Sequence, residues 1–206
     1  LRNFGYNNAT DAKRSPGSSI KPLTAYAPAL ELGLVTQTTL VNDGPPDEVH
    51  LNGTYWYPFN DDYAYAGVIT IADALRTSRN TVAAQLVDKL SPQTSFDFLT
   101  KKLGVTSAVE YRVVGETGQI QSDIAYAPMA LGALTDGITV REMAQAYSAF
   151  PNDGVFTYSR VYTHVEDASG NLLLDNAPET IVAFKANTAR NISSMLTNAV
   201  AYGTGG

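Results

Sequence analysis

Apolar residues recur at helical spacing through most of this chain and alternate, as in a strand, over one stretch. Spacings of three and four residues place side chains on one face of a helix, whereas alternation places them on one face of a strand. The strand-like pattern covers residues 155–174, with residues 167–171 as the turn of a hairpin. The helical stretches are residues 18–33, 80–90, 91–103, 139–150 and 188–201. This distribution predicts a helix-rich α+β protein, and 206 residues suit a single domain.

Punctuating residues define the ends of the first helix and of the segment that follows it. Pro16-Gly17 places Ser18 at or just before the helix start, and the helix continues no further than Gly33. Residues 35–67 show no sustained period, so we expect a long ordered loop there, a feature that is often functional. The pair Asp61-Asp62 in this loop is interpreted as solvated turn residues.

Charge and composition exclude several classes of function. The chain carries 14 basic and 20 acidic residues, a formal net charge of −6, so we expect no nucleic-acid partner. It has no cysteine, which excludes disulfides and thiol catalysis. His50 and His164 lie far apart without further ligands nearby, so we predict no metal site and expect both on the surface. No nucleotide-binding glycine motif occurs, so we predict no cofactor.

The first helix carries a pattern that is compatible with nucleophilic catalysis. Ser18 and Lys21 are three residues apart, and such residues share one face of a helix. A lysine whose pKa is lowered by burial can take the proton of a neighbouring hydroxyl. A Ser-x-x-Lys pattern alone is common, but here Pro16-Gly17 and Pro22 place the serine at a helix start.

A second hydroxyl and an amide occur together in two Ser-x-Asn sequences. Ser169-Gly170-Asn171 lies in the predicted hairpin turn, where these residue types are expected. Ser78-Arg79-Asn80 lies between helical stretches. Its serine and amide are suited to proton transfer and substrate binding, and the alternative is that Asn80 caps the following helix.

Several of these segments resemble one protein family. Residues 14–23 closely resemble the nucleophile segment of class A, bifunctional penicillin-binding proteins, and Ser78-Arg79-Asn80 is similar to the second motif of this family. Residues 137–154 and Tyr202-Gly203-Thr204-Gly205 match further family landmarks, so the resemblance covers the whole chain in order. It implies a β-lactamase/transpeptidase-like fold, with a helical subdomain and part of a central antiparallel sheet. Residues 155–174 would belong to that sheet.

The resemblance also implies roles for four residues. Ser18 would be the acylated nucleophile and Lys21 its activating base. Ser78 would relay a proton to the leaving amine, and Asn80 would hold the stem-peptide amide. The implied enzyme is a D,D-transpeptidase that cross-links peptidoglycan stem peptides ending in D-Ala-D-Ala. β-Lactams would acylate Ser18 because they mimic this dipeptide. The family works on the extracytoplasmic face of the bacterial cytoplasmic membrane, anchored by a segment absent from this chain.

One family motif is absent from the sequence. The third motif, Lys-Thr-Gly or Lys-Ser-Gly on a strand, does not occur. The resemblance therefore implies that residues 1–206 are a transpeptidase domain fragment, incomplete at both ends, which lacks the first sheet strands and the Lys-Thr-Gly strand. Unpaired strand edges are costly, so we expect a second polypeptide carrying that strand. The chain alone is expected to be inactive.

Two other functions remain open. A class A serine β-lactamase shares the fold and the first motif, but it carries a Glu-x-x-x-Asn loop after the second motif. The Glu-x-x-x-Asn of this chain, Glu48 to Asn52, precedes that motif. A catalytically inactive binding domain with the penicillin-binding fold is the other alternative, because the third motif is missing.

Overall fold

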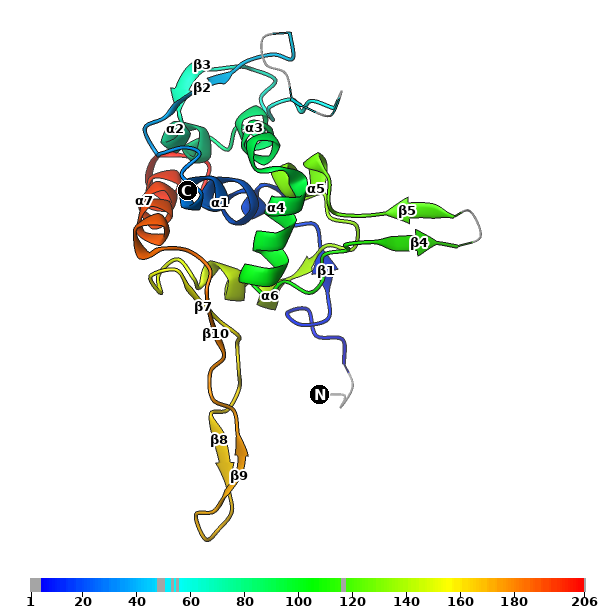
Figure 1. The fold of residues 1–206 in the computed structure, drawn as a ribbon, viewed down its shortest axis with the longest axis vertical. Coiled ribbons are helices and arrows are strands. Elements are labelled where there is room, and N and C mark those ends of the chain that lie inside the picture. Colours follow the sequence, from blue (N-terminus) through cyan, green and yellow to red (C-terminus); the bar gives the residue numbers. More distant parts are fainter. Residues whose placement is uncertain (1–4, 48–50, 53, 55, 116–117, 206) are drawn as a thin grey trace.

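The computed structural model of the chain describes residues 5–47, 51–52, 54, 56–115 and 118–205. Helices form the body, and paired strands lie around it or extend away from it (Figure 1). This arrangement confirms the prediction of a helix-rich α+β fold. No helix among the described residues is both long and apolar enough to cross a membrane.

Helical elements account for most of the buried residues. The α-helices of the described chain are α1 Ala27–Glu31, α2 Ile71–Arg76, α3 Asn80–Leu90, α4 Pro92–Asp97, α5 Tyr126–Leu131, α6 Val140–Tyr147 and α7 Ala186–Tyr202. The 3-10 helix η1 covers Gly17–Ile20, and π-helical turns form η2, Pro22–Tyr26, and η3, Phe98–Lys102. The predicted helix over residues 80–90 is confirmed as α3.

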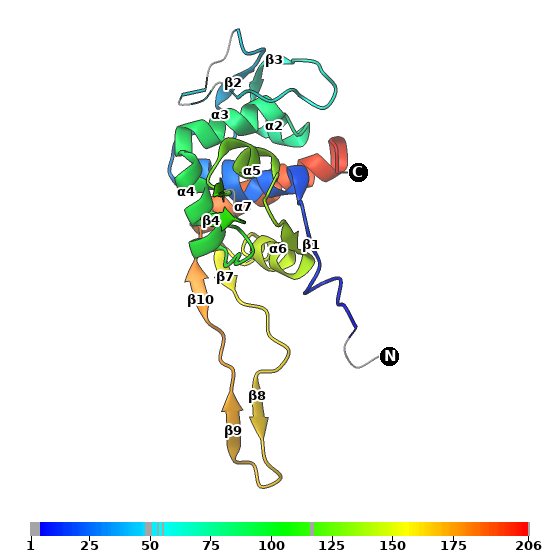
Figure 2. The same cartoon turned by 90° about the vertical axis from the view of Figure 1, so that its right-hand side faces the viewer.

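The first helical segment lies at the centre of the body (Figures 1 and 2). The elements η2 and α1 pack against α3, α5 and α7. The sequence predicted one apolar face, but residues 20–29 are buried on all sides because helices surround them. Two polar side chains are buried with them, Lys21 and Thr24. The Thr24 hydroxyl donates to the Met129 carbonyl over 2.6 Å. Lys21 is the charged residue of this buried segment.

Side chains cap the starts of α2, α4 and α6. Thr139 and Glu142 form a reciprocal capping box at the start of α6. The Glu142 carboxylate also accepts hydrogen bonds from the backbone N–H groups of Thr106 and Ser107, each over 2.9 Å. Burial raises the pKa of Glu142, but hydrogen bonds from Ser107, Thr139 and Thr106 outweigh burial and lower it to about 2. This ionised carboxylate ties α6 to the segment that follows η3.

The strands pair in antiparallel twos. The strands of the described chain are β1 Lys13–Arg14, β2 Leu40–Asp43, β3 Gly67–Thr70, β4 Arg112–Val114, β5 Gln119–Gln121, β6 Ile138–Thr139, β7 Val155–Thr157, β8 His164–Glu166, β9 Leu172–Asp175 and β10 Thr180–Val182. The pairs are β1–β6, β2–β3, β4–β5, β7–β10 and β8–β9. The pair β1–β6 places the residues just before η1 beside those that lead into α6.

The strands differ from the sequence prediction in two respects. The expected loop over residues 35–67 contains β2, which pairs with β3, and the hairpin β4–β5 was not predicted. The predicted hairpin over residues 155–174 is present in part: β8 and β9 pair across a hydrogen-bonded turn from Asp167 to Asn171, whereas β7 pairs with β10, beyond the predicted range. Its assignment to a central sheet is wrong for the described residues, because β8 and β9 pair with each other and extend away from the helices (Figures 1 and 2).

Candidate active site

The predicted nucleophile segment is held by contacts from distant parts of the chain. Ser18 lies in η1 and is exposed. The preceding turn is fixed by the Ser15 hydroxyl, which donates to the Gly132 carbonyl over 2.5 Å. On the other side, the Tyr147 hydroxyl of α6 donates to the Ser19 carbonyl over 2.7 Å. These contacts orient the first turn of the helical segment independently of the side chain of Ser18.

Two glycines allow this close approach. A Cβ on Gly132 would lie 2.4 Å from the Gly17 carbonyl oxygen, and a Cβ on Gly137 would lie 2.4 Å from the Arg14 carbonyl carbon. Gly132 has a φ of +73°, the left-handed conformation that favours glycine at the end of a helix. The backbone after α5 can therefore pack directly on the turn that carries Ser18.

Lys21 projects from the same segment toward the second predicted motif. Its ammonium donates to the Ser78 carbonyl over 2.6 Å, to the Ser78 hydroxyl over 3.0 Å and to Asn80 Oδ1 over 2.6 Å. These acceptors use the three N–H donors of an ammonium group. Burial lowers the pKa of Lys21 to about 8, and the negative charge of Asp61 acts in the opposite direction. The neutral form is therefore much more accessible than for a solvated lysine.

Ser78 adopts an unusual backbone conformation between α2 and α3. Its φ is +56°, in the left-handed region that non-glycine residues rarely occupy. With this conformation both the carbonyl and the hydroxyl of Ser78 meet Lys21. Such backbone strain is frequent at functional sites.

A pocket of about 470 Å³ joins the two motifs. Its lining includes Ser18 from the first motif and Ser78 and Asn80 from the second, together with Asp61 and Thr204. The backbone N–H of Lys21 donates to the Ser18 carbonyl, but within the described residues no side-chain hydrogen bond joins Ser18 to Lys21. The structure therefore brings Lys21, Ser78 and Asn80 into direct side-chain contact and places Ser18 on the pocket wall.

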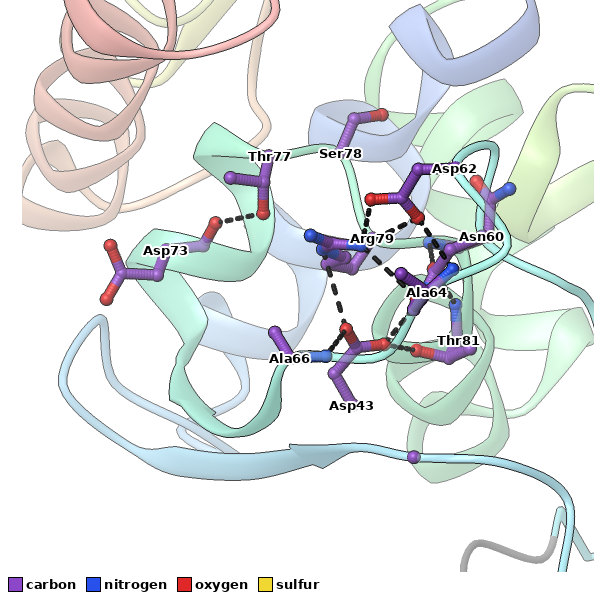
Figure 3. Close-up of polar contacts among 12 residues, drawn as sticks. Asp43, Asn60, Asp62, Ala64, Ala66, Asp73, Thr77, Ser78, Arg79 and Thr81 are labelled. Carbon is purple, nitrogen blue, oxygen red and sulfur yellow. Dashed lines mark hydrogen bonds and ion pairs between the residues drawn. The ribbon is translucent and has the colours of Figure 1, made fainter.

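Polar residues that the sequence analysis missed support the second motif. Asp43 of β2 is buried and forms an ion pair with Arg79 Nε over 3.5 Å. Asp62 pairs with the same guanidinium over 2.9 Å, and Asn60 bonds to both Asp43 and the start of α3 (Figure 3). Asp61 and Asp62 are exposed, as expected, but they line the pocket and take part in its electrostatics. The length of the loop over residues 35–67 was the one sequence signal for this role.

Other sequence candidates do not enter the site. Ser169 and Asn171 lie in the turn of the β8–β9 hairpin, as predicted. His164 is exposed on β8, 3.5 Å from Glu166. Glu48 and His50 lie outside the described residues. Within the described part of the chain, no group of three or more His, Asp or Glu side chains is placed to hold a metal ion.

The mixed fold and the contact between the Ser-x-x-Lys and Ser-x-Asn motifs define a protein of the β-lactamase/transpeptidase fold class. The family model for the penicillin-binding protein transpeptidase domain matches residues 3–206. The chain belongs to this transpeptidase domain family.

Curated relatives carry the name penicillin-binding protein 1A. The protein of Clostridium acetobutylicum is 35% identical over 205 residues, which cover 96% of this chain and 24% of the relative. That of Clostridium perfringens strain 13 is 31% identical over 206 residues, which cover 98% and 29%. That of Streptococcus pneumoniae is 33% identical over 203 residues, which cover 98% and 26%. The chain thus spans about a quarter of the length of these curated relatives.

Solved structures have the same fold. The D,D-transpeptidase domain of a peptidoglycan glycosyltransferase from Eggerthella lenta superposes with a TM-score of 0.72 at 22% identity, covering 96% of this chain and 51% of that one. Penicillin-binding protein A of Mycobacterium tuberculosis, as an imipenem acyl-enzyme complex, gives 0.69 at 18% identity, with 94% and 45% covered. At these identities the likeness establishes the fold.

Proposed function

We propose that this chain is part of a serine D,D-transpeptidase that cross-links peptidoglycan stem peptides through an acyl-enzyme at Ser18. The observation that carries the proposal is the buried Lys21, hydrogen-bonded to Ser78 and Asn80, with a pKa lowered to about 8. A buried lysine that can lose its proton near pH 7 is suited to general-base catalysis. Membership of the transpeptidase domain family supports the same reaction class.

In the proposed acylation, neutral Lys21 accepts the proton of Ser18 while Ser18 Oγ bonds to the carbonyl carbon of the penultimate D-Ala. The C–N bond to the terminal D-Ala then breaks. Ser78 donates a proton to the leaving amine and regains one from Lys21, so D-Ala leaves as a neutral amine. Asn80 both orients Lys21 and offers its amide to the substrate. These steps follow the general logic of an activated serine nucleophile.

Deacylation completes the transfer. The amine of a neighbouring stem peptide attacks the acyl carbonyl and loses a proton to the Lys21–Ser78 pair. The bond between that carbon and Ser18 Oγ breaks, and Ser18 recovers its proton. A β-lactam would acylate Ser18 by the same first step, with opening of its ring amide in place of loss of D-Ala.

The chain is further proposed to be a fragment of this transpeptidase domain, since it spans about a quarter of its relatives and contains no Lys-Thr-Gly. A second polypeptide segment with that strand would complete the site. The intact protein would act on the extracytoplasmic face of the bacterial cytoplasmic membrane, where peptidoglycan is assembled, held by an anchor outside this chain.

Covalent labelling with a fluorescent penicillin tests the proposal in the full-length protein that carries this chain. Ser18→Ala should abolish labelling, because the attacking oxygen is removed. Ser19→Ala is the matched control and should retain most of it, since the Ser19 hydroxyl donates to the Pro16 carbonyl over 2.6 Å. An unlabelled wild-type protein would favour the inactive binding domain. Sustained nitrocefin turnover would favour a β-lactamase.

A further inference from the structure

The helix that carries the second motif begins without a cap of its own. Arg79 stands at the N-cap position of α3 and its side chain makes no capping hydrogen bond. The cap comes instead from Asn60 in the preceding loop. Its Oδ1 accepts from the backbone N–H of Asn80 over 2.8 Å and from that of Thr81 over 3.4 Å. An asparagine twenty residues away in sequence from Asn80 thus serves as the N-cap of α3.

The other end of the Asn60 amide is held by a buried charge. Asn60 Nδ2 donates to Asp43 Oδ1 over 2.7 Å and to the Ala64 carbonyl over 2.9 Å. Both acceptors lack protons to donate, so they require the nitrogen of the amide, and the N–H groups of α3 require its oxygen. Asn60 is buried, with 3% of its surface exposed, so its amide has one orientation that satisfies every neighbour.

Asp43 anchors this arrangement in the fold. Its carboxylate accepts from Asn60, from the Thr81 hydroxyl and, over 2.8 Å, from the Ala66 N–H, and it faces the Arg79 guanidinium (Figure 3). Asp43 is fully buried at the end of β2. A buried carboxylate held by this many donors is rigid, because loss of any donor leaves charge unsatisfied in a medium of low dielectric.

The same loop also holds the side chain of Asn80. Asn80 Nδ2 donates to the Phe59 carbonyl over 2.8 Å, while Asn80 Oδ1 accepts from Lys21 over 2.6 Å. Residues 59 and 60 therefore fix both the backbone and the side chain of the residue that meets the proposed base. A shift of Asn60 would pass directly to the contact between Asn80 and Lys21.

We propose that Asn60, braced by Asp43, is a positioning residue that sets the distance between Asn80 and Lys21 for acylation. It acts through Asn80. This inference rests on the proposed function, because it concerns the rate at which Ser18 is acylated.

The test uses Asn60→Asp in the full-length protein, with two measurements for each variant. One is the first-order rate constant of acylation at saturating fluorescent penicillin, and the other is the final amount of label per chain. Asn60→Asp keeps the size and the acceptors but places a carboxylate against Asp43. We expect the rate constant to fall by about 100-fold, as for displacement of a catalytic group by an ångström, while the final label stays near that of the wild type.

Two further variants provide the controls: one exchanges the charge between residues 43 and 60, and the other places a like-charge contact elsewhere. In Asp43→Asn/Asn60→Asp the new amide can donate to the new carboxylate, so the rate constant should recover to within about 10-fold of wild type. Asn52→Asp creates a similar like-charge contact with Asp88, 3.0 Å from Asn52 Nδ2, away from the pocket, and should leave the rate unchanged. Asn60→Ser adds no charge and should show the same slow, complete labelling if Asn60→Asp does not fold.

The outcomes separate this inference from the proposed function. A wild-type rate in the Asn60 variants would overturn it, and so would a reduced final label with an unchanged rate constant, which indicates a purely structural role. Failure of the charge exchange to restore the rate would overturn the part assigned to Asp43. Absence of Ser18 labelling in the wild type would instead contradict the proposed function.

Discussion

At the residue scale, Lys21 is notable because it is a charged side chain buried in the core. Its side chain is 1% exposed, and its ammonium donates to the carbonyl and hydroxyl of Ser78 and to the amide oxygen of Asn80. A neutral amine has two donors and one lone pair. Loss of the proton therefore frees one of these contacts, and the lone pair can take a proton from a hydroxyl in the pocket.

The titration of Lys21 predicts the pH dependence of acylation. Burial lowers its pKa to about 8, so the acylation rate should rise with pH through a midpoint near this value. The charge of Asp61 raises the pKa, so Asp61→Asn should lower it and move the midpoint to lower pH. Stopped-flow measurement of labelling between pH 6 and about pH 10 would follow both midpoints.

Two variants control this prediction. Asp62→Asn removes the same formal charge, but Asp62 is neutralised by Arg79, so its midpoint should stay nearer that of the wild type. Lys21→Arg keeps a positive charge that does not dissociate and should acylate very slowly. Normal acylation by this variant would mean that the residue acts only through its charge.

At the scale of elements, the end of α5 and the turn before η1 are in backbone contact. Ser15 donates to the carbonyl of Gly132, and Gly132 approaches Gly17 so closely that a side chain would not fit between them. The position of Ser18 therefore depends on a helix end more than a hundred residues further along the chain.

Gly132→Ala is expected to displace this turn and slow acylation of Ser18 by about 10-fold to 100-fold. The new Cβ would lie 2.4 Å from the Gly17 oxygen, and the alanine would also occupy a positive φ. Gly170→Ala separates the two effects, because Gly170 has a φ of +82° but a Cβ there meets nothing within 4 Å. Equal labelling rates in both variants would show that the contact with Gly17 does not position the nucleophile.

At the scale of the whole molecule, an apolar groove of about 480 Å³ lies between α6 and α7. Its lining includes Tyr147 and Phe150 on one side and Leu196 and Val200 on the other. Val200 is 61% exposed, a high value for an apolar residue on a helix that packs against the core. This surface and the proposed missing strands lead to one expectation for the chain in isolation.

Expressed alone, the chain should self-associate and enhance the fluorescence of anilinonaphthalene sulfonate, because exposed contiguous apolar surface favours both. Co-expression with the segment that carries the third motif should yield a complex with lower dye fluorescence. Leu196→Ser/Val200→Ser should reduce dye binding by the chain alone, whereas Val161→Ser, at a 97% exposed position of the hairpin, should not. A monomer that unfolds cooperatively and leaves the dye dark would contradict the fragment proposal.

Local features of the sequence were sufficient to predict α3, α6 and α7, whereas α5 was not predicted. The bounds of α3 and the capping box of Thr139 and Glu142 depend on residues within a few positions of one another, and periodicity and caps report such contacts directly. The Ser-x-x-Lys and Ser-x-Asn patterns are equally local, and together with the order of the other motifs they indicated the family. The hairpin turn from Asp167 to Asn171 was predicted for the same reason.

Tertiary structure decided which of these residues meet. The contacts of Lys21 span 57 and 59 residues of sequence, and the pairing of β2 with β3 joins two edges of a segment without periodicity. Neither the Asn60 cap nor the burial of Asp43 has a local pattern, because each depends on which polar groups packing brings to the start of α3. The residue types and their spacing thus determined the predicted helices and the family of this chain. The buried polar contacts at the site were determined by packing, since a hydrogen bond between distant residues forms only where the folded backbone brings donor and acceptor together.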